Sequence, residues 1–357
     1  MARQGWFVVV LSLAVSVQIA HADKPPAEAA GSDDGADEAP EEELPHIEGP
    51  KLVDLGHGAE IALPAGLVLY EAAAAQTMMR EWGNDPEGTV AITFVGHATV
   101  MITTPGSRVL IDPFLENSLY GVRRAKAAGI AAEDIANVDL VLVTHAHRDH
   151  LSRRSLARLP DKAPVVVPPG CERLVHREGL ARVEELDPGR SFRASDKSDV
   201  EVTAVPVRHS GGVGKYGRRG ACGYVVRTPR HVIYVAGDTG YFSGFAEIGR
   251  RFRPDVALLP IAGYEPASFR EEHMSPLDAV YAFEDLGARV MIPTSYGSFP
   301  LSYEPLDAPL EWLNQIMRAR GLPLCGAQAR GAEHAPCVAI LDHGETVRFS
   351  KQGADAR

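Results

Sequence analysis

The chain has few cysteines, four in 357 residues, and no two of them form a Cys-x-x-Cys pair. A zinc site made of cysteine thiolates is therefore not expected. Cys325 and Cys337 are close enough in sequence to form a disulfide in an oxidising compartment, and a pair of free thiols is the alternative. Cys222 lies in a strand-like run and is expected to be a buried thiol.

A long apolar run is also missing. The apolar segment 6–20 is shorter than the roughly 20 residues that a membrane-spanning helix needs. Arg3 precedes this segment and Ala20-His21-Ala22 follows it, so residues 1–22 are typical of a cleaved secretory signal peptide. An uncleaved N-terminal anchor is the alternative. Both predict a secreted protein, in the periplasm, with its folded part outside the cytoplasm.

The chain lacks an excess of basic charge. Residues 23–50 carry ten acidic side chains and one lysine, which accounts for most of the net charge of −11. Such a segment buries too little apolar surface to fold, so it is expected to be a disordered acidic linker. Residues 51–357 are nearly neutral and have no basic patch typical of nucleic-acid binding. We therefore expect no nucleic-acid partner.

Strands and helices are predicted from residue 51 onward. Residues 51–88 form a small N-terminal extension, with a strand at 60–64 and a helix at 70–82. In the domain over 89–350, two groups of strands interspersed with helices predict an α/β fold of two packed sheets with helices outside. The predicted strands are 90–95, 99–103, 108–111, 138–144, 164–168, 200–206, 222–227, 231–236, 255–259, 289–293, 337–341 and 346–349. The predicted helices are 152–158, 171–178, 243–252, 276–286 and 307–320.

Four potential metal ligands lie within six residues. His145, His147, Asp149 and His150 directly follow the apolar run 138–143, which is predicted to be a buried strand. Imidazole nitrogen and carboxylate oxygen are ligands that zinc prefers in catalytic sites. Alternation along an extended segment places His145 and His147 on one side. The cluster therefore predicts a metal site with one or two Zn²⁺ ions per chain.

Two further segments support this prediction. His209 follows the strand over 200–206, and Asp238 follows the strand over 231–236. A carboxylate has two oxygens with spare lone pairs, so Asp238 is able to bridge two metal ions. Neither segment would indicate a metal site without the cluster at 145–150.

Together these residues resemble the metallo-β-lactamase superfamily, whose signature is His-x-His-x-Asp-His followed by a distant His and a distant Asp. Within it, the chain is similar to N-acylphosphatidylethanolamine phospholipase D and its bacterial relatives. The matching stretches are Gly96-His97-Ala98-Thr99, Leu110-Ile111-Asp112-Pro113, Ala236-Gly237-Asp238-Thr239-Gly240-Tyr241, Leu259-Pro260-Ile261-Ala262-Gly263-Tyr264-Glu265-Pro266 and His273-Met274-Ser275-Pro276.

The resemblance implies an αββα sandwich with a dinuclear zinc site at one edge. It implies that His145, His147 and His209 hold one zinc, that Asp149 and His150 hold the other, and that Asp238 bridges them. It also implies that His273 lies near the substrate phosphate, and that His97 and Asp112 have supporting roles.

The sequence departs from the family at one position. Ser295 in Pro293-Thr294-Ser295-Tyr296-Gly297 stands where the family usually has a further histidine. A neutral hydroxyl is a much poorer zinc ligand than imidazole. We therefore expect unequal affinities for the two metal ions.

The predicted function is hydrolysis of a phosphodiester, phospholipase D-like, with water activated between two metals. Asp149 and His273 are the candidate catalytic residues, and His273 would orient the phosphate or protonate the leaving oxygen. The expected partner is a small-molecule or lipid substrate. One alternative is lactone, amide or β-lactam hydrolysis at the same metals. Another is a non-catalytic binding protein with a degraded site. Peripheral membrane contact through the loop 114–120, and the oligomeric state, stay open.

Overall fold

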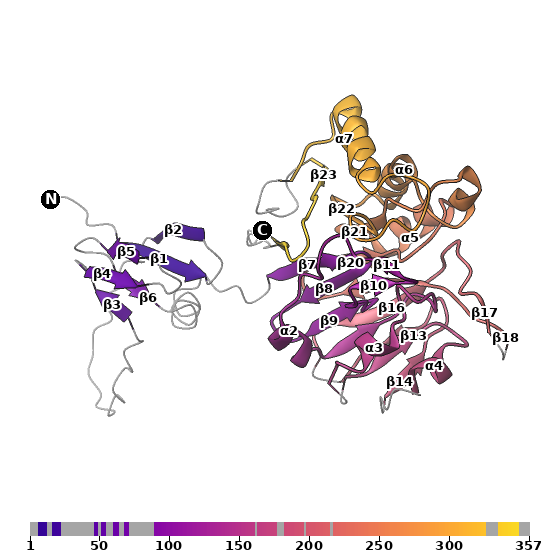
Figure 1. Cartoon of the computed structure of the whole chain (residues 1–357), viewed down its shortest axis with the longest axis horizontal. Helices are drawn as coiled ribbons and strands as arrows, with labels where there is room; N and C mark the ends of the chain where they lie inside the picture. Colours follow the sequence, from indigo (N-terminus) through magenta and orange to yellow (C-terminus); the bar gives the residue numbers. More distant parts are fainter. Residues whose placement is uncertain are drawn as a thin grey trace, which may run out of the picture. The chain divides into compact units, whose positions relative to one another are not determined.

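The chain divides into two units, 1–87 and 88–357, in the computed structural model (Figure 1). In the second unit the structure describes residues 89–160, 163–176, 182–195, 198–214, 217–325 and 335–349. In the first unit it describes six strands: β1 (Trp6–Ser12), β2 (Ser16–Ala22), β3 (His46–Glu48), β4 (Lys51–Asp54), β5 (Glu60–Leu63) and β6 (Val68–Tyr70).

The first unit contains a four-stranded sheet in the order β2-β1-β6-β3 and a separate β4-β5 hairpin. β5 confirms the strand predicted at 60–64. The helix predicted at 70–82 falls almost entirely outside the described residues, as does most of the acidic segment 23–50. β1 and β2 lie in the segment expected to be a signal peptide, whose cleavage stays a prediction. Among the described residues, no helix has the length and apolar character needed to cross a membrane.

The second unit is built on two seven-stranded sheets. The first has, in order, β14 (Val183–Glu185), β13 (Val165–Val167), β12 (Leu140–Leu142), β9 (Arg108–Ile111), β8 (Thr99–Thr103), β7 (Val90–Gly96) and β24 (Thr346–Phe349). The second has β15 (Ser191–Phe192), β16 (Glu201–Val205), β19 (Gly223–Arg227), β20 (Val232–Val235), β21 (Val256–Pro260), β22 (Val290–Thr294) and β23 (Cys337–Val338). Both sheets mix parallel and antiparallel pairs; in the first, β12 pairs with β9 in parallel and β7 pairs with β8 antiparallel.

Helices cover the outer faces of the two sheets (Figure 1). α2 (Ala132–Ala136), α3 (Arg153–Leu156) and α4 (Glu172–His176) accompany the first sheet, and α5 (Gly244–Phe252), α6 (Pro276–Leu286) and α7 (Ala308–Arg320) accompany the second. One core lies between the sheets and continues under α5–α7, and it includes Phe94, Tyr224 and Tyr234. A second core lies under α3 and α4 and includes Val141 and Leu156. The αββα sandwich predicted from the resemblance is confirmed.

Local sequence explains why elements begin where they do. Ser275 caps α6, because its side chain accepts from the backbone N–H of Asp278 while the Asp278 carboxylate accepts from the backbone N–H of Ser275. Pro276 follows at the first helical position, as predicted. β12 and β13 consist of buried branched residues on both faces, which is typical of parallel strands covered on both sides.

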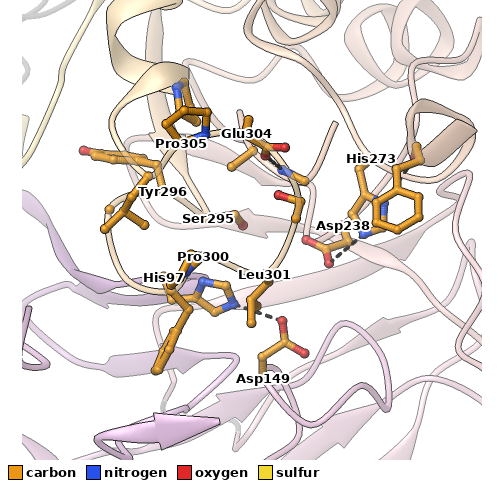
Figure 2. A pocket seen from close by; sticks show the side chains of 18 of the residues that line it. His97, Asp149, Asp238, His273, Ser295, Tyr296, Pro300, Leu301, Glu304 and Pro305 are labelled. Atoms are coloured by element: carbon orange, nitrogen blue, oxygen red, sulfur yellow. Dashed lines mark hydrogen bonds and ion pairs between the residues drawn. The ribbon is translucent and has the colours of Figure 1, made fainter. Parts of the chain in front are cut away.

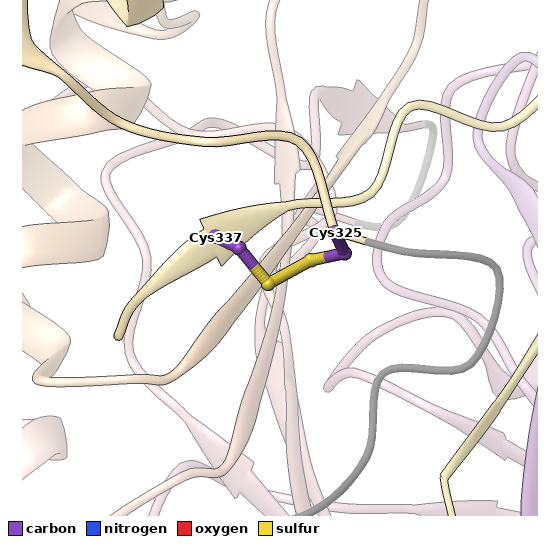
Figure 3. The surroundings of a disulfide bond; sticks show 2 residues. All are labelled: Cys325 and Cys337. Atoms are coloured by element: carbon purple, nitrogen blue, oxygen red, sulfur yellow. A yellow bond between two sulfur atoms is a disulfide. The ribbon is translucent and has the colours of Figure 1, made fainter. Parts of the chain in front are cut away.

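Of the two states left open for Cys325 and Cys337, the structure has the disulfide, with a Cα–Cα distance of 5.2 Å (Figure 3). It ties the segment after α7 to β23. Cys222 is a free and fully buried thiol, as expected, and Cys171 is a second buried free thiol.

Every strand and helix predicted between residues 90 and 349 has a counterpart in the structure. Short elements were not predicted: the hairpins β10 (Ser118–Leu119)–β11 (Val122–Arg123) and β17 (Val213–Gly214)–β18 (Gly217–Arg218), the outer strands β14 and β15, α2, and the 3₁₀ helix η1 (Ala267–Glu271). Strands of two or three residues and helices of five residues give too short a pattern to be seen in sequence.

Candidate metal centre and pocket

The predicted ligands come together at one edge of the sandwich. The loop after β12 supplies four of them, the segment after β16 supplies His209, and the turn after β20 supplies Asp238. An isolated bridge pairs His145 with Ala221, so the loop after β12 contacts the segment that leads into β19 of the second sheet. Gly237 makes the close approach of the Asp238 turn feasible. Its φ is +63°, and a Cβ there would lie 2.6 Å from the Cβ of Thr144.

Three imidazoles form the first half of the cluster. His145 Nε2 lies 3.0 Å from His147 Nδ1, which lies 3.2 Å from His209 Nε2. Three nitrogens bound tetrahedrally to one zinc at the usual bond length would be about 3.3 Å apart. The observed spacing therefore fits a shared metal ion.

Hydrogen bonds orient these rings. His209 Nδ1–H donates to the backbone carbonyl of Glu272 at 3.0 Å, so the lone pair on Nε2 faces the cluster. His145 Nδ1 lies 3.0 Å from the Thr144 hydroxyl, which leaves its Nε2 toward His147. A partner on the outer nitrogen is what fixes the tautomer of a metal-ligating histidine.

Burial keeps the three imidazoles neutral. It is the main reason that the pKa of His145 lies well below its ordinary value, and the neighbouring His150 lowers it further. Burial likewise lowers the pKa of His147 and His209. Neutral imidazole is the form that binds a metal ion.

The second half of the cluster contains Asp149 and His150 and faces Asp238. His150 Nδ1–H donates to Asp112 at 2.7 Å, and both side chains are fully buried. His150 Nε2 is also buried, 3.1 Å from Asp238 Oδ2 and 3.6 Å from Asp149 Oδ2, and makes no hydrogen bond within the described structure. A buried ring nitrogen facing two carboxylates in this way fits a metal ion.

Charge complementarity holds the carboxylates ionised. Burial alone would raise the pKa of Asp149, but His150 and His97 lower it to about 2. Burial also opposes ionisation of Asp238, and His150 and His273 more than offset this, so its pKa lies well below the ordinary value. The site therefore offers anionic oxygen ligands as well as the neutral imidazoles of His145, His147 and His209.

Asp238 lies between the two halves. Its Oδ2 is 3.8 Å from His145 Nε2 on one side and 3.1 Å from His150 Nε2 on the other. Its ligand atom forms one group with those of His145 and His150 and another with those of His209 and His273. Within each group all ligand atoms lie within 4.8 Å of one another. A carboxylate in this position would be able to reach two metal ions.

His273 lies beside Asp238, with its Nε2 3.6 Å from Asp238 Oδ2 (Figure 2). Its Nδ1 lies 3.2 Å from the carbonyl of Phe269, a hydrogen bond that turns Nε2 toward the cluster. The ring is partly exposed and borders the pocket. The predicted site residues are therefore brought together, and Ser295 lies on the same pocket wall.

A cavity of about 260 Å³ opens beside the cluster (Figure 2). Its polar end is formed by His97, His147, Asp149, Asp238 and His273. The remaining wall is mainly apolar: Tyr120, Ala262, Phe269, Tyr296, Phe299, Pro300, Leu301, Pro305, Leu306 and Pro309. No lysine or arginine belongs to this lining in the part of the chain that the structure describes.

The sequence did not point to Glu304, which shapes this wall. Its carboxylate is buried and accepts hydrogen bonds from the backbone N–H groups of Gly263, Tyr264 and Glu265 at 2.5, 3.4 and 3.1 Å. Glu304 thus joins two loops that both contribute to the pocket lining. The family resemblance at Tyr264-Glu265-Pro266 indicated that one of these loops belongs to the site. No sequence pattern indicated the other loop, which carries Glu304.

The loop 114–120 mainly packs into the protein. Phe114 and Leu119 are buried and form a small cluster with Phe299. Tyr120 is 70% exposed and lines the mouth of the pocket. Arg148 lies over its ring at 5.7 Å from the centroid.

Comparisons with known proteins agree with this geometry. The beta-lactamase superfamily domain matches residues 107–296, just over half of the chain. A UPF0173 metal-dependent hydrolase of Pyrococcus furiosus is 35% identical over 261 residues, which cover 73% of this chain and 100% of the relative. The N-acyl-phosphatidylethanolamine-hydrolyzing phospholipase D 1 of Caenorhabditis elegans is 29% identical over 254 residues, 66% of this chain and 71% of that enzyme. The structure of Igni18, a metallo hydrolase from Ignicoccus hospitalis, aligns with a TM-score of 0.55 and 25% identity, covering 74% of this chain and 100% of that one.

The fold and the cluster define a metal-dependent hydrolase with a metallo-β-lactamase fold. The chain belongs to the beta-lactamase superfamily.

Proposed function

We propose that this hydrolase uses zinc and cleaves a phosphodiester. The observation that carries the proposal is the position of His273, whose Nε2 faces the cluster beside Asp238 while Nδ1 is held by Phe269. A nitrogen in this position is able to contact an oxygen of a group bound next to the carboxylates. The nematode relative, named as a phospholipase D, supports a phosphodiester as the substrate.

The donor set supports zinc. One ion would be held by His145, His147 and His209, the other by Asp149 and His150, and Asp238 would contact both. Asp112 and the Glu272 carbonyl fix the outer ring nitrogens of His150 and His209. Bound zinc ions would supply Lewis acidity that activates water and neutralises charge on the scissile group. His273 would orient a phosphate oxygen through Nε2. Asp149 would act as a ligand rather than an acid, because its pKa of about 2 keeps it ionised.

The apolar wall supports a substrate with an apolar body. Phe299, Leu301 and Leu306 line the cavity next to the polar end, and Tyr120 and Phe269 are exposed at its mouth. A lipid phosphodiester would place its headgroup at the metals and an acyl chain along this wall. The same exposed side chains would make peripheral contact with a lipid surface.

A second candidate is hydrolysis of an uncharged lactone or ester. It is favoured by the absence of lysine and arginine from the described lining, since a strongly anionic substrate usually meets such a side chain. The two candidates differ in what binds at His273, because an uncharged ester offers it no anionic oxygen.

A substrate panel tests both proposals. Zinc-loaded protein is assayed with bis(p-nitrophenyl) phosphate, an N-acylphosphatidylethanolamine in mixed micelles, a long-chain lactone and a chromogenic β-lactam. We expect turnover of the phosphodiesters that is lost with a chelator and regained with zinc. Turnover of the lactone alone would favour the second candidate. No turnover of any substrate by protein that binds two zinc ions would favour a non-catalytic binding protein.

We also propose that the protein is exported to the periplasm, on the basis of the segment 1–22. Sequencing the N-terminus of protein recovered from the periplasm tests this. A start at or near Asp23 is expected, and a start at Met1 would contradict cleavage.

A further inference from the structure

The second half of the cluster has an imidazole beside it that is not among the ligands expected from the resemblance. His97 follows β7, is 5% exposed, and has a φ of +60°. Its Nε2 lies 2.9 Å from Asp149 Oδ2 (Figure 2). Left-handed backbone is uncommon for residues other than glycine and is found where the surroundings require a particular side-chain position.

Ser295, where the family usually has a histidine, is the backbone neighbour of His97. The Ser295 N–H donates to the His97 carbonyl at 2.9 Å, and Ser295 also has a positive φ, +63°. Both side chains line the same pocket. The backbone of His97 is thus hydrogen-bonded to that of Ser295, and the His97 imidazole occupies the space next to Asp149.

The distances fit a metal-binding set. One ligand atom each from His97, Asp149 and His150 lie within 4.8 Å of one another, and His150 Nε2 is 3.1 Å from Asp238. Two nitrogens and one carboxylate oxygen are thus close together, and a second carboxylate lies next to His150. Without His97 the same half would offer only one nitrogen.

We propose that His97 is a ligand of the second metal ion and replaces the histidine that is missing at position 295. This inference rests on the proposed dinuclear site but not on the identity of the substrate. The alternative is that His97 only donates a hydrogen bond to Asp149 and orients it. Both roles place Nε2 near Asp149 Oδ2, so substitutions must separate them.

The test measures stepwise affinity for Zn²⁺ and Co²⁺ with a chromophoric chelator, and the visible absorption of the Co²⁺-loaded protein. His97→Ala is expected to weaken the second equivalent about tenfold or more, and to change the Co²⁺ bands that appear with that equivalent. The first equivalent, held by His145, His147 and His209, is expected to keep its affinity. Unfolding of the metal-free variants checks that each is folded.

His97→Gln separates the two roles, because its side-chain amide keeps a donor near the position of Nε2 but is a poor zinc ligand. If His97 is a ligand, His97→Gln behaves like His97→Ala, and Ser295→Ala binds both equivalents normally. Adding Ser295→His to His97→Ala is expected to restore the second equivalent, since histidine tolerates positive φ better than most residues.

Normal binding of the second equivalent by His97→Gln, or by His97→Ala, would overturn the proposal. Equal loss of both equivalents in His97→Ala would overturn it too. These outcomes differ from failure of the proposed function, in which the unsubstituted protein itself binds no second metal ion or turns over none of the substrates.

Discussion

His150 and Asp112 form a fully buried pair in which the ring Nδ1–H donates to the carboxylate at 2.7 Å. The other oxygen of Asp112 accepts from the Thr144 backbone N–H, also at 2.7 Å. The Thr144 hydroxyl donates to the same Asp112 oxygen as the His150 ring. One carboxylate thus fixes both the ring of His150 and the start of the loop that carries the other ligands.

Asp112→Asn is expected to weaken binding of the second metal ion by about 10- to 100-fold, because the ring of His150 loses its anionic acceptor. Metal titration of the folded variant measures this. Asp199→Asn is the matched control. Asp199 also accepts from a threonine hydroxyl and a backbone N–H, of Thr104 and Gly106, but contacts no histidine in the described structure. Equal metal affinity in the two variants would contradict the role assigned to Asp112.

His273→Ala is expected to lower turnover of a phosphodiester by about 100-fold or more while the metal content stays unchanged, if His273 contacts the phosphate in the transition state. Steady-state kinetics with metal analysis of the same sample measures both quantities. Tyr281→Ala, which removes a partly exposed ring on α6 outside the pocket lining, serves as the control. Unchanged turnover in His273→Ala would reject the catalytic role.

Tyr224→Phe is expected to lower the free energy of unfolding by about 1 kcal/mol, because the buried Tyr224 hydroxyl donates to the Val143 carbonyl at 2.8 Å and the carbonyl would lose this donor. Urea denaturation measures the difference. Tyr234→Phe is a close control, since the Tyr234 hydroxyl is buried in the same core without a hydrogen-bond partner in the described structure. That variant is expected to be as stable as the unsubstituted protein or more so. The reverse order would contradict the assignment.

Asp278→Asn is expected to destabilise the protein by about 1 kcal/mol at pH 7. Burial alone would raise the pKa of Asp278, but hydrogen bonds from Arg270 and Ser275 bring it below its ordinary value. A carboxylate with a depressed pKa in the folded state stabilises above its unfolded pKa, about 3.9, and loses this as the pH falls through the folded pKa.

The difference between Asp278→Asn and the unsubstituted protein should therefore be greatest at neutral pH and shrink below about pH 4. Urea denaturation from neutral pH down to about pH 3 follows it. Asp285→Asn removes a charge near the other end of α6 without touching the cap. Its amide oxygen is still able to accept from the Tyr241 hydroxyl, so the variant controls for net charge. A difference that stays constant over this whole range would show that the charge of Asp278 is not involved.

The sequence predicted the parts of the site that depend on short segments. His145 and His147 could be placed because they alternate directly after a buried strand, and Asp238 because it follows another. His97 and Glu304 could not be placed by such patterns. Glu304 is 40 residues from Tyr264, whose backbone N–H it binds, and His97 is 52 residues from Asp149. Their positions depend on how the two sheets pack, so only the resemblance put His97 near the site.

The two sheets share the metal centre, because β12 of the first sheet carries His145 and His150 into it while the second sheet supplies His209 and Asp238. A bound ion would therefore cross-link the two sheets, and they could separate only if metal–ligand bonds were broken. At a free metal concentration roughly 100 times the dissociation constant, such binding would add about 2.7 kcal/mol to the stability of the folded chain. Loss of the metal would therefore lower the free energy of unfolding of this domain as well as its hydrolytic activity.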